Sequence, residues 1–66
     1  MRISVNNKQT DLLKGNTIAE LATQLELPVL GVAIAVNNRM IPRKEWETYK
    51  LHEGDNLVII KAACGG

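Results

Sequence analysis

The sequence predicts an α+β fold in which one main helix packs across one face of a mixed, four- to five-stranded sheet. Three observations indicate this arrangement: an alternating segment with a polar return at residues 1–12, a single amphipathic segment at residues 17–25, and an uninterrupted apolar segment at residues 57–60. A chain of 66 residues forms one domain, and its core must be compact.

The first hairpin is predicted by alternation. Residues 1–5 alternate apolar and polar side chains, which is typical of a half-buried strand. Asn6 and Asn7 tolerate positive φ and predict a tight turn into an antiparallel return over residues 8–12. Because this return is polar, we expect it at an edge of the sheet.

The helix is predicted by its start signal and by its apolar spacing. Thr17 and Glu20 form the pattern of a capping box, in which each side chain accepts a hydrogen bond from the other residue's backbone N–H. The apolar residues that follow share one helix face: Ile18, Leu21, Ala22 and Leu25. Pro28 disfavours helix at the residue before it, so the helix ends near residue 25 or 26. A helix this short must lie on the sheet to persist.

The next strand has two different faces. Residues 32–36 alternate β-branched residues with Ala33 and Ala35, which predicts a large face suited to the helix and a smooth alanine face. A second Asn-Asn pair at residues 37–38 predicts a turn into a short return at residues 39–41. Pro42 then begins a turn or a single helical turn.

The last strand closes the fold. Residues 57–60 follow a tight turn in which Gly54 can take a positive φ. No polar residue interrupts this strand, so we expect it at the centre of the sheet and buried on much of both faces. This order of elements is that of a β-grasp, the ubiquitin-like architecture. We expect a β-grasp domain at residues 1–61 and a flexible tail at residues 62–66, ending in two glycines.

Composition and charge exclude several classes of partner. The formal net charge of +1 gives no long-range field, so we expect neither nucleic acid nor a membrane as partner. A single cysteine excludes an internal disulfide framework and suits a reducing compartment. No secretory leader opens the chain and no apolar run approaches a membrane span, so we expect a cytoplasmic protein.

Few residues are suited to catalysis. His52 is the only histidine and lies in a polar turn without a second ligand at metal spacing, so we expect no bound metal or cofactor. The carboxylates are spread over turns and indicate a solvated surface: Glu45, Glu47, Glu53 and Asp55. Trp46 and Tyr49 are more typical of core anchors than of binding groups. Cys64 has no basic neighbour that would activate its thiol, and we assign it no role. We therefore expect that the isolated protein catalyses nothing.

The terminal glycines are the remaining candidate. Glycine loses more conformational freedom on ordering than any other residue, so Gly65 and Gly66 do not serve stability. They have no Cβ and can thread a narrow channel into a partner's active site, with residues 62–66 reaching about 17 Å at roughly 3.3–3.6 Å per residue. The Gly66 carboxylate is a poor electrophile and needs activation by a nucleotide-using partner. By itself a terminal Gly-Gly is more typical of a frayed end, but after the last strand of a β-grasp these features predict a substrate and carrier rather than an enzyme.

The chain resembles the ThiS family, the sulfur carrier proteins of thiamine biosynthesis. The resemblance covers essentially the whole chain, including the helix at residues 17–25 and the segments "VAIAVNN", "IPRKEW" and "LHEGDNLVII". Its most specific parts are Pro42-Arg43 with Trp46, and Leu51 with Gly54-Asp55, whereas Gly65-Gly66 alone does not discriminate among ubiquitin-like proteins.

The resemblance implies that partner enzymes act on Gly66. A ThiF-type adenylyltransferase, related to ubiquitin-activating enzymes, would use ATP to adenylate the Gly66 carboxylate, with Gly65 recognised as part of the tail. Sulfur from a donor such as a cysteine desulfurase would displace AMP and leave a thiocarboxylate. A ThiG-type thiazole synthase would take that sulfur into the thiazole ring of thiamine. The residue before the glycine pair varies in this family, so no role is implied for Cys64.

Two other functions stay open at this point. The small, sulfur-carrying subunit of molybdopterin synthase is also a β-grasp that ends in Gly-Gly, although that family usually runs longer. A β-grasp interaction module or protein modifier would use no sulfur chemistry, and a modifier would leave Gly66 in an isopeptide bond.

We expect partners to dock on the sheet face away from the helix. Ala33 and Ala35 predict a smooth surface there, and alternate residues of the last strand join it. Val58 and Ile60 are the candidates, although the opposite register would place the other two residues of this strand on that face.

Overall fold

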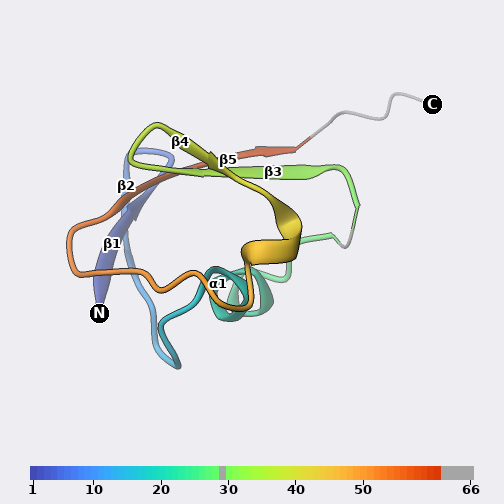
Figure 1. Ribbon diagram of the computed structural model, residues 1–66. Helices are drawn as coiled ribbons and strands as arrows, with labels where there is room; N and C mark the ends of the chain where they lie inside the picture. The colour runs from blue at the N-terminus through green and yellow to red at the C-terminus, as the bar shows by residue number, and fades with distance from the viewer. Residues whose placement is uncertain (29, 62–66) are drawn as a thin grey trace.

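The computed structural model describes residues 1–28 and 30–61, and within them five strands pair into one mixed sheet (Figure 1). The order across the sheet is β2-β1-β5-β3-β4, with β5 parallel to β1 and antiparallel to β3. The elements are β1 (Arg2–Val5), β2 (Lys8–Asp11), α1 (Ile18–Gln24), β3 (Val32–Val36), β4 (Arg39–Ile41), the 3-10 turn η1 (Arg43–Glu45) and β5 (Asn56–Lys61). The predicted β-grasp and the central position of the last strand are confirmed.

Both hairpins turn on an asparagine pair. Asn6 and Asn7 have φ of 51° and 67°, and Asn37 and Asn38 have φ of 50° and 70°. Positive φ at both central residues of a two-residue turn matches the twist of antiparallel strands, and asparagine tolerates that region better than most residues. The two predicted turns therefore set the registers of the β1–β2 and β3–β4 pairs.

The start of α1 is the predicted capping box. The Thr17 hydroxyl accepts a hydrogen bond from the Glu20 backbone N–H at 3.2 Å, and the Glu20 carboxylate accepts from the Thr17 N–H at 3.1 Å. The Asn16 N–H also donates to this carboxylate at 2.9 Å, and a Cβ on Gly15, whose φ is +80°, would collide with it. Hydrogen bonds from the Asn16 backbone and from Thr17 hold the pKa of Glu20 below its usual value of 4.5.

The end of α1 is a left-handed cap. Glu26 has φ of 57°, the Glu26 N–H donates to the Thr23 carbonyl, and the Leu27 N–H donates to the Ala22 carbonyl. This pair of bonds is the Schellman motif, which usually has glycine at the left-handed position. The helix therefore ends at Gln24, one residue before the predicted end at residue 25 or 26. Glu26 occupies the left-handed position, which a residue with a Cβ tolerates poorly.

The segment between β4 and β5 lies against the helix start. The Leu51 N–H donates to the Asn16 carbonyl, and the Ala19 N–H donates to the Trp46 carbonyl. Trp46 is buried, its Nε1–H donates to the Ile41 carbonyl at 3.1 Å, and the Arg43 guanidinium lies 4.7 Å from the ring centroid. The prediction that Trp46 is a core anchor is confirmed.

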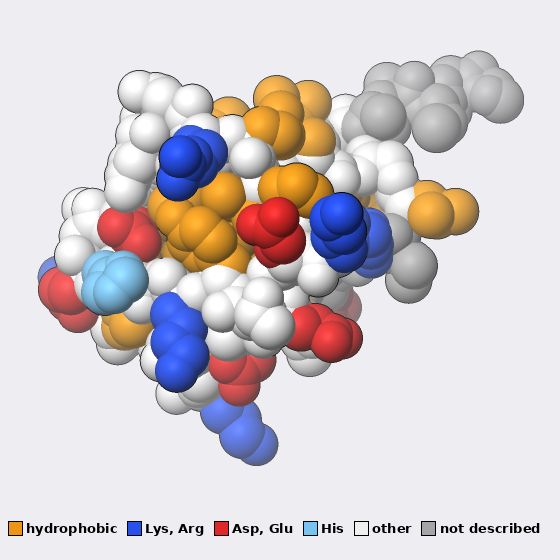
Figure 2. All heavy atoms as spheres, viewed as in Figure 1, with side chains coloured by type: hydrophobic (Ala, Val, Ile, Leu, Met, Phe, Trp, Pro, Cys, Tyr) orange, Lys and Arg blue, Asp and Glu red, His pale blue; other side chains and the backbone are white. Residues whose placement is uncertain are grey.

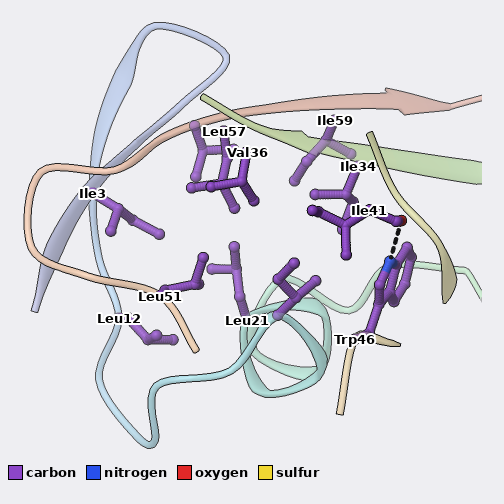
Figure 3. Close-up of a cluster of buried hydrophobic side chains, with 12 residues drawn as sticks. Ile3, Leu12, Leu21, Ile34, Val36, Ile41, Trp46, Leu51, Leu57 and Ile59 are labelled. Carbon is purple, nitrogen blue, oxygen red and sulfur yellow. Dashed lines mark hydrogen bonds between the residues drawn. The ribbon is translucent and has the colours of Figure 1, made fainter. Parts of the chain in front are cut away.

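The core fills the space between one face of the sheet and α1 (Figure 3). The helix contributes Ile18 and Leu21, and the sheet contributes alternate residues of β1, β3 and β5. The full set of buried side chains is Ile3, Val5, Leu12, Ile18, Leu21, Ile34, Val36, Ile41, Trp46, Leu51, Leu57 and Ile59. No charged or polar side chain is buried among the described residues, so this core is held by apolar packing.

One prediction about β5 is wrong. The uninterrupted apolar run indicated a strand buried on much of both faces, but Val58 and Ile60 are exposed, whereas Leu57 and Ile59 are buried. Within the described residues, α1 covers one face of the sheet and no second layer covers the other (Figure 1). The side chains of Val58 and Ile60 are therefore not part of the core, and they remain available on the outer surface of the sheet.

Candidate functional site

Five apolar side chains on the face of the sheet away from α1 form a contiguous surface, here called the outer patch: Ala33, Ala35, Met40, Val58 and Ile60. They belong to three adjacent strands, because β3 pairs with both β4 and β5. In the observed register Ala33 lies opposite Ile60, and Ala35 lies between Val58 and Met40. Directly opposite residues in antiparallel strands place their side chains on the same face.

The register decides which half of β5 joins the outer patch. The Ile34–Ile59 and Val36–Leu57 pairs point into the core, so the residues between them point outward. This places the candidates Val58 and Ile60 on the alanine face, which resolves the choice of register that the sequence left open. Met40 was not predicted, although a two-residue turn at residues 37–38 places residue 40 opposite Ala35, so the sequence contained the signal.

The large side chains of the outer patch are substantially exposed. The exposed fractions are 57% for Met40, 37% for Val58 and 54% for Ile60, and Figure 2 shows hydrophobic side chains gathered over this part of the sheet. Single exposed apolar residues are normal on a small protein, but a contiguous group across three strands is typical of an interaction surface. Because alanine has only a methyl side chain, Ala33 and Ala35 leave low, smooth positions beside the larger side chains of Met40, Val58 and Ile60.

The outer patch occupies only the half of the sheet from which the tail leaves. The outer face of β1 and β2 carries polar residues, with Ser4 opposite Gln9 and Arg2 opposite Asp11. The apolar side chains instead follow β5 toward its last residue, Lys61, which directly precedes residues 62–66. A partner seated on the outer patch would therefore also lie next to Lys61, the last residue that the structure describes.

The tail residues lie outside the described part of the chain. The predicted modification of Gly66 and the predicted recognition of Gly65 therefore stay predictions, and Cys64, to which no role was assigned, lies outside the described residues as well. The predicted division into residues 1–61 and 62–66 is likewise not tested by the described residues.

The other candidates for chemistry hold turns. His52 is exposed, and its backbone N–H donates to Asp55 Oδ2 at 2.8 Å. Asp55 Oδ1 also accepts from Asn37 Nδ2 at 3.1 Å, and the Glu53 carboxylate accepts from the Arg2 backbone N–H. Glu53 and Asp55 therefore accept hydrogen bonds that stabilise the turn before β5. From the sequence they were expected only to form part of a solvated surface.

Neither a metal site nor a catalytic cleft is found in residues 1–28 and 30–61. No group of three or more metal-ligating side chains gathers there, and no pocket opens between the elements. No helix in the same residues is long and apolar enough to cross a bilayer. What the described surface offers is an exposed apolar surface beside the end of β5.

Comparison with known proteins agrees with this architecture. The model of the ThiS family matches residues 3–66. The sulfur carrier protein ThiS of Escherichia coli (strain K12) is 30% identical over 66 residues, with 100% of both chains covered. The structure of a thiamine biosynthesis protein, ThiS from Geobacter metallireducens, superposes with a TM-score of 0.82 at 20% identity, covering 100% of both chains, and shows that the fold is shared. Because the family model spans nearly the whole chain, this protein belongs to the ThiS family.

Proposed function

We propose that this protein is a sulfur carrier of thiamine biosynthesis, and that Gly66 carries the sulfur as a thiocarboxylate. The observation that supports this most strongly is the match of the ThiS family model through residue 66, which includes both terminal glycines. The relative from Escherichia coli that aligns over the whole chain is named as a sulfur carrier protein. In this function the protein is a substrate of other enzymes and performs no catalysis itself.

The chemistry begins with activation of the carboxylate. An oxygen of Gly66 attacks the α-phosphorus of ATP on a ThiF-type adenylyltransferase, pyrophosphate leaves, and an acyl-adenylate forms. The terminal sulfur of a persulfide, formed with a donor such as a cysteine desulfurase, then attacks the carbonyl carbon. AMP leaves with the bonding electrons, and a thiol reduces the resulting acyl disulfide to the thiocarboxylate. A ThiG-type synthase takes the sulfur from there. ATP is thus used by the partner, and no cofactor is bound by the carrier.

The outer patch is proposed as the docking face for these partners. It is apolar, exposed and next to the last residue of β5, so one contact surface can hold the domain while Gly65 and Gly66 enter the partner's active site. Two residues without Cβ present the least bulk where backbone must pass closely. A patch with buried apolar contact and a polar surround is the usual anatomy of a protein interface.

Two measurements test this function. Intact mass spectrometry of the protein from its own host should show a sulfur-for-oxygen mass increase located at Gly66. ATP–pyrophosphate exchange with the adenylyltransferase should fall at least tenfold in Ala35→Arg or Ala33→Arg, because a long charged side chain then stands in the middle of the outer patch.

The matched control is Gln9→Arg, which adds the same side chain to the polar half of the same sheet face. All three variants should melt close to wild type, since none changes the core. Wild-type exchange rates in folded Ala33→Arg and Ala35→Arg would show that partners dock elsewhere. An isopeptide-linked Gly66 without sulfur would identify a protein modifier instead.

A further inference from the structure

The side chain of Asn6 makes two hydrogen bonds to a single residue of β5. Its Oδ1 accepts from the Ile59 backbone N–H at 2.8 Å, and its Nδ2 donates to the Ile59 carbonyl at 3.3 Å. Both contacts are partly buried and join residues 53 positions apart in the sequence. A side-chain amide offers the same donor and acceptor as a peptide group. Asn6 therefore binds β5 as a neighbouring strand would.

This contact lies where β1 stops pairing with β5. The parallel pairing covers only Ser4 with Asn56 and Val5 with Leu57, and its last backbone bond runs from the Asn6 N–H to the Leu57 carbonyl at 2.9 Å. The chain then turns away through its positive-φ asparagine pair. The Asn6 side chain adds one more step to the pairing, at the residue two positions before Lys61.

The equivalent asparagine of the second turn holds the opposite end of β5. Asn37 Oδ1 accepts from the Asn56 N–H at 3.0 Å, and Asn37 Nδ2 donates to Asp55 Oδ1 at 3.1 Å. The first residues of the two turns thus act on different ends of one strand. Asn37 holds the end where β5 begins, and Asn6 holds the end that leads to the tail.

We propose that Asn6 is a positioning residue, whose side chain fixes the direction in which β5 presents the C-terminal tail to the adenylating partner. The proposal rests on the proposed function and adds a residue that neither the tail nor the outer patch contains. Among the described residues, β3 flanks the end of β5 on one side, and the Asn6 amide supplies the restraint on the other side.

A small swing of the strand is enough to matter. Ile59 and Lys61 are two residues apart, which is roughly 7 Å at about 3.3 Å per residue, so a rotation of about 10° at Ile59 displaces Lys61 by about 1 Å. A misplacement of about 1 Å at a reacting group can cost on the order of 100-fold in rate. Lys61 stands five residues before the reacting carboxylate of Gly66, and a tail that we expect to be flexible absorbs most of this displacement, so we expect a fall in kcat of about five- to tenfold rather than 100-fold.

The test compares three glycine variants of the two turns. Glycine accepts positive φ readily, so Asn6→Gly, Asn7→Gly and Asn37→Gly keep the turn backbone and remove only the side chain. Asn7 is the control for the turn, since no hydrogen bond of its side chain is found in the described residues. Asn37 is the control for loosening β5 at the end away from the tail.

Asn6→Gly should speed hydrogen exchange of the Ile59 amide at least tenfold relative to Asn7→Gly, since that amide loses its acceptor. In ATP–pyrophosphate exchange below the melting range, Asn6→Gly should lower kcat five- to tenfold and leave the KM for the carrier within twofold, because the outer patch is intact. Asn7→Gly and Asn37→Gly should keep wild-type kcat.

Equal losses in Asn6→Gly and Asn37→Gly would reduce the role of Asn6 to general stability and overturn the proposal, as would an unchanged kcat in Asn6→Gly. These outcomes differ from failure of the proposed function, in which the wild-type carrier itself would support no exchange.

Discussion

Ile59 and Ile60 are neighbours in β5 that point to opposite faces of the sheet, with exposed fractions of 9% and 54%. Replacing each by serine makes the same chemical change on the two faces. Full burial of an isoleucine side chain contributes roughly 1.5–3 kcal/mol to stability, so Ile60→Ser, which removes a half-buried side chain, should cost about 1 kcal/mol. Ile59→Ser loses nearly the full contribution and adds a buried hydroxyl at roughly 1–3 kcal/mol, for a total of about 4 kcal/mol.

These costs predict different outcomes for folding. At roughly 0.05–0.15 kcal/mol per residue, the free energy of unfolding of a domain of this size is about 3–10 kcal/mol. Ile60→Ser should therefore remain folded with a modestly lower midpoint in urea, whereas Ile59→Ser should lose about 4 kcal/mol, which shifts its midpoint about four times as far and unfolds it if the wild type lies at the low end of that range. Urea unfolding followed by tryptophan fluorescence measures both, since the single tryptophan is buried in the core.

Binding should show the opposite sensitivity. If the adenylating partner covers the outer patch, burying the exposed half of Ile60 contributes about 1 kcal/mol, and a desolvated serine hydroxyl costs about 1 kcal/mol more. A loss of about 2 kcal/mol corresponds to about a 30-fold increase in Kd, at 1.4 kcal/mol per tenfold. Titration calorimetry with folded Ile60→Ser checks this value. A Kd within twofold of wild type would refute the argument that the outer patch is a docking face.

Four further outcomes are expected. The folded-state pKa of Glu20 lies below its unfolded value, so the ionised carboxylate stabilises the folded protein above pH 4.5, and this contribution is lost as the pH falls through the folded pKa. The difference in Tm between wild type and Glu20→Gln, measured by calorimetry, should therefore shrink below pH 4.5. Glu26→Gly should raise the free energy of unfolding in urea by about 1 kcal/mol by relieving its left-handed backbone, whereas Glu26→Ala should not. Gly65→Val should leave Tm close to wild type and lower ATP–pyrophosphate exchange on the order of 100-fold, because a β-branched side chain restricts the tail where backbone passes closely; unchanged exchange would contradict a threaded tail. Cys64→Ser should still form the thiocarboxylate in a sulfur-loading assay read by mass, and a variant that is adenylated but not loaded would give this thiol a role.

Local patterns in the sequence predicted most of the fold. The capping box of Thr17 and Glu20, the two asparagine turns and the alternation of residues 32–36 act over a few residues, and each has the predicted form in the structure. The helix and strand bounds differ from expectation by one or two residues, at ends where hydrogen bonding fades gradually. Such signals depend on backbone preferences and side-chain spacing, which are properties of neighbouring residues.

The sequence by itself determined that an alanine face exists on β3, that residues 57–60 form an apolar strand, and that two glycines stand at positions 65 and 66. Only the tertiary structure decided that Val58 and Ile60 share the alanine face, and that Asn6 reaches Ile59 across 53 positions of sequence. An apolar run such as residues 57–60 fits either register equally well by itself, since shifting the pairing by one residue exchanges the two faces. The choice is made by which side chains fill the space against α1, and that depends on residues from every other element at once.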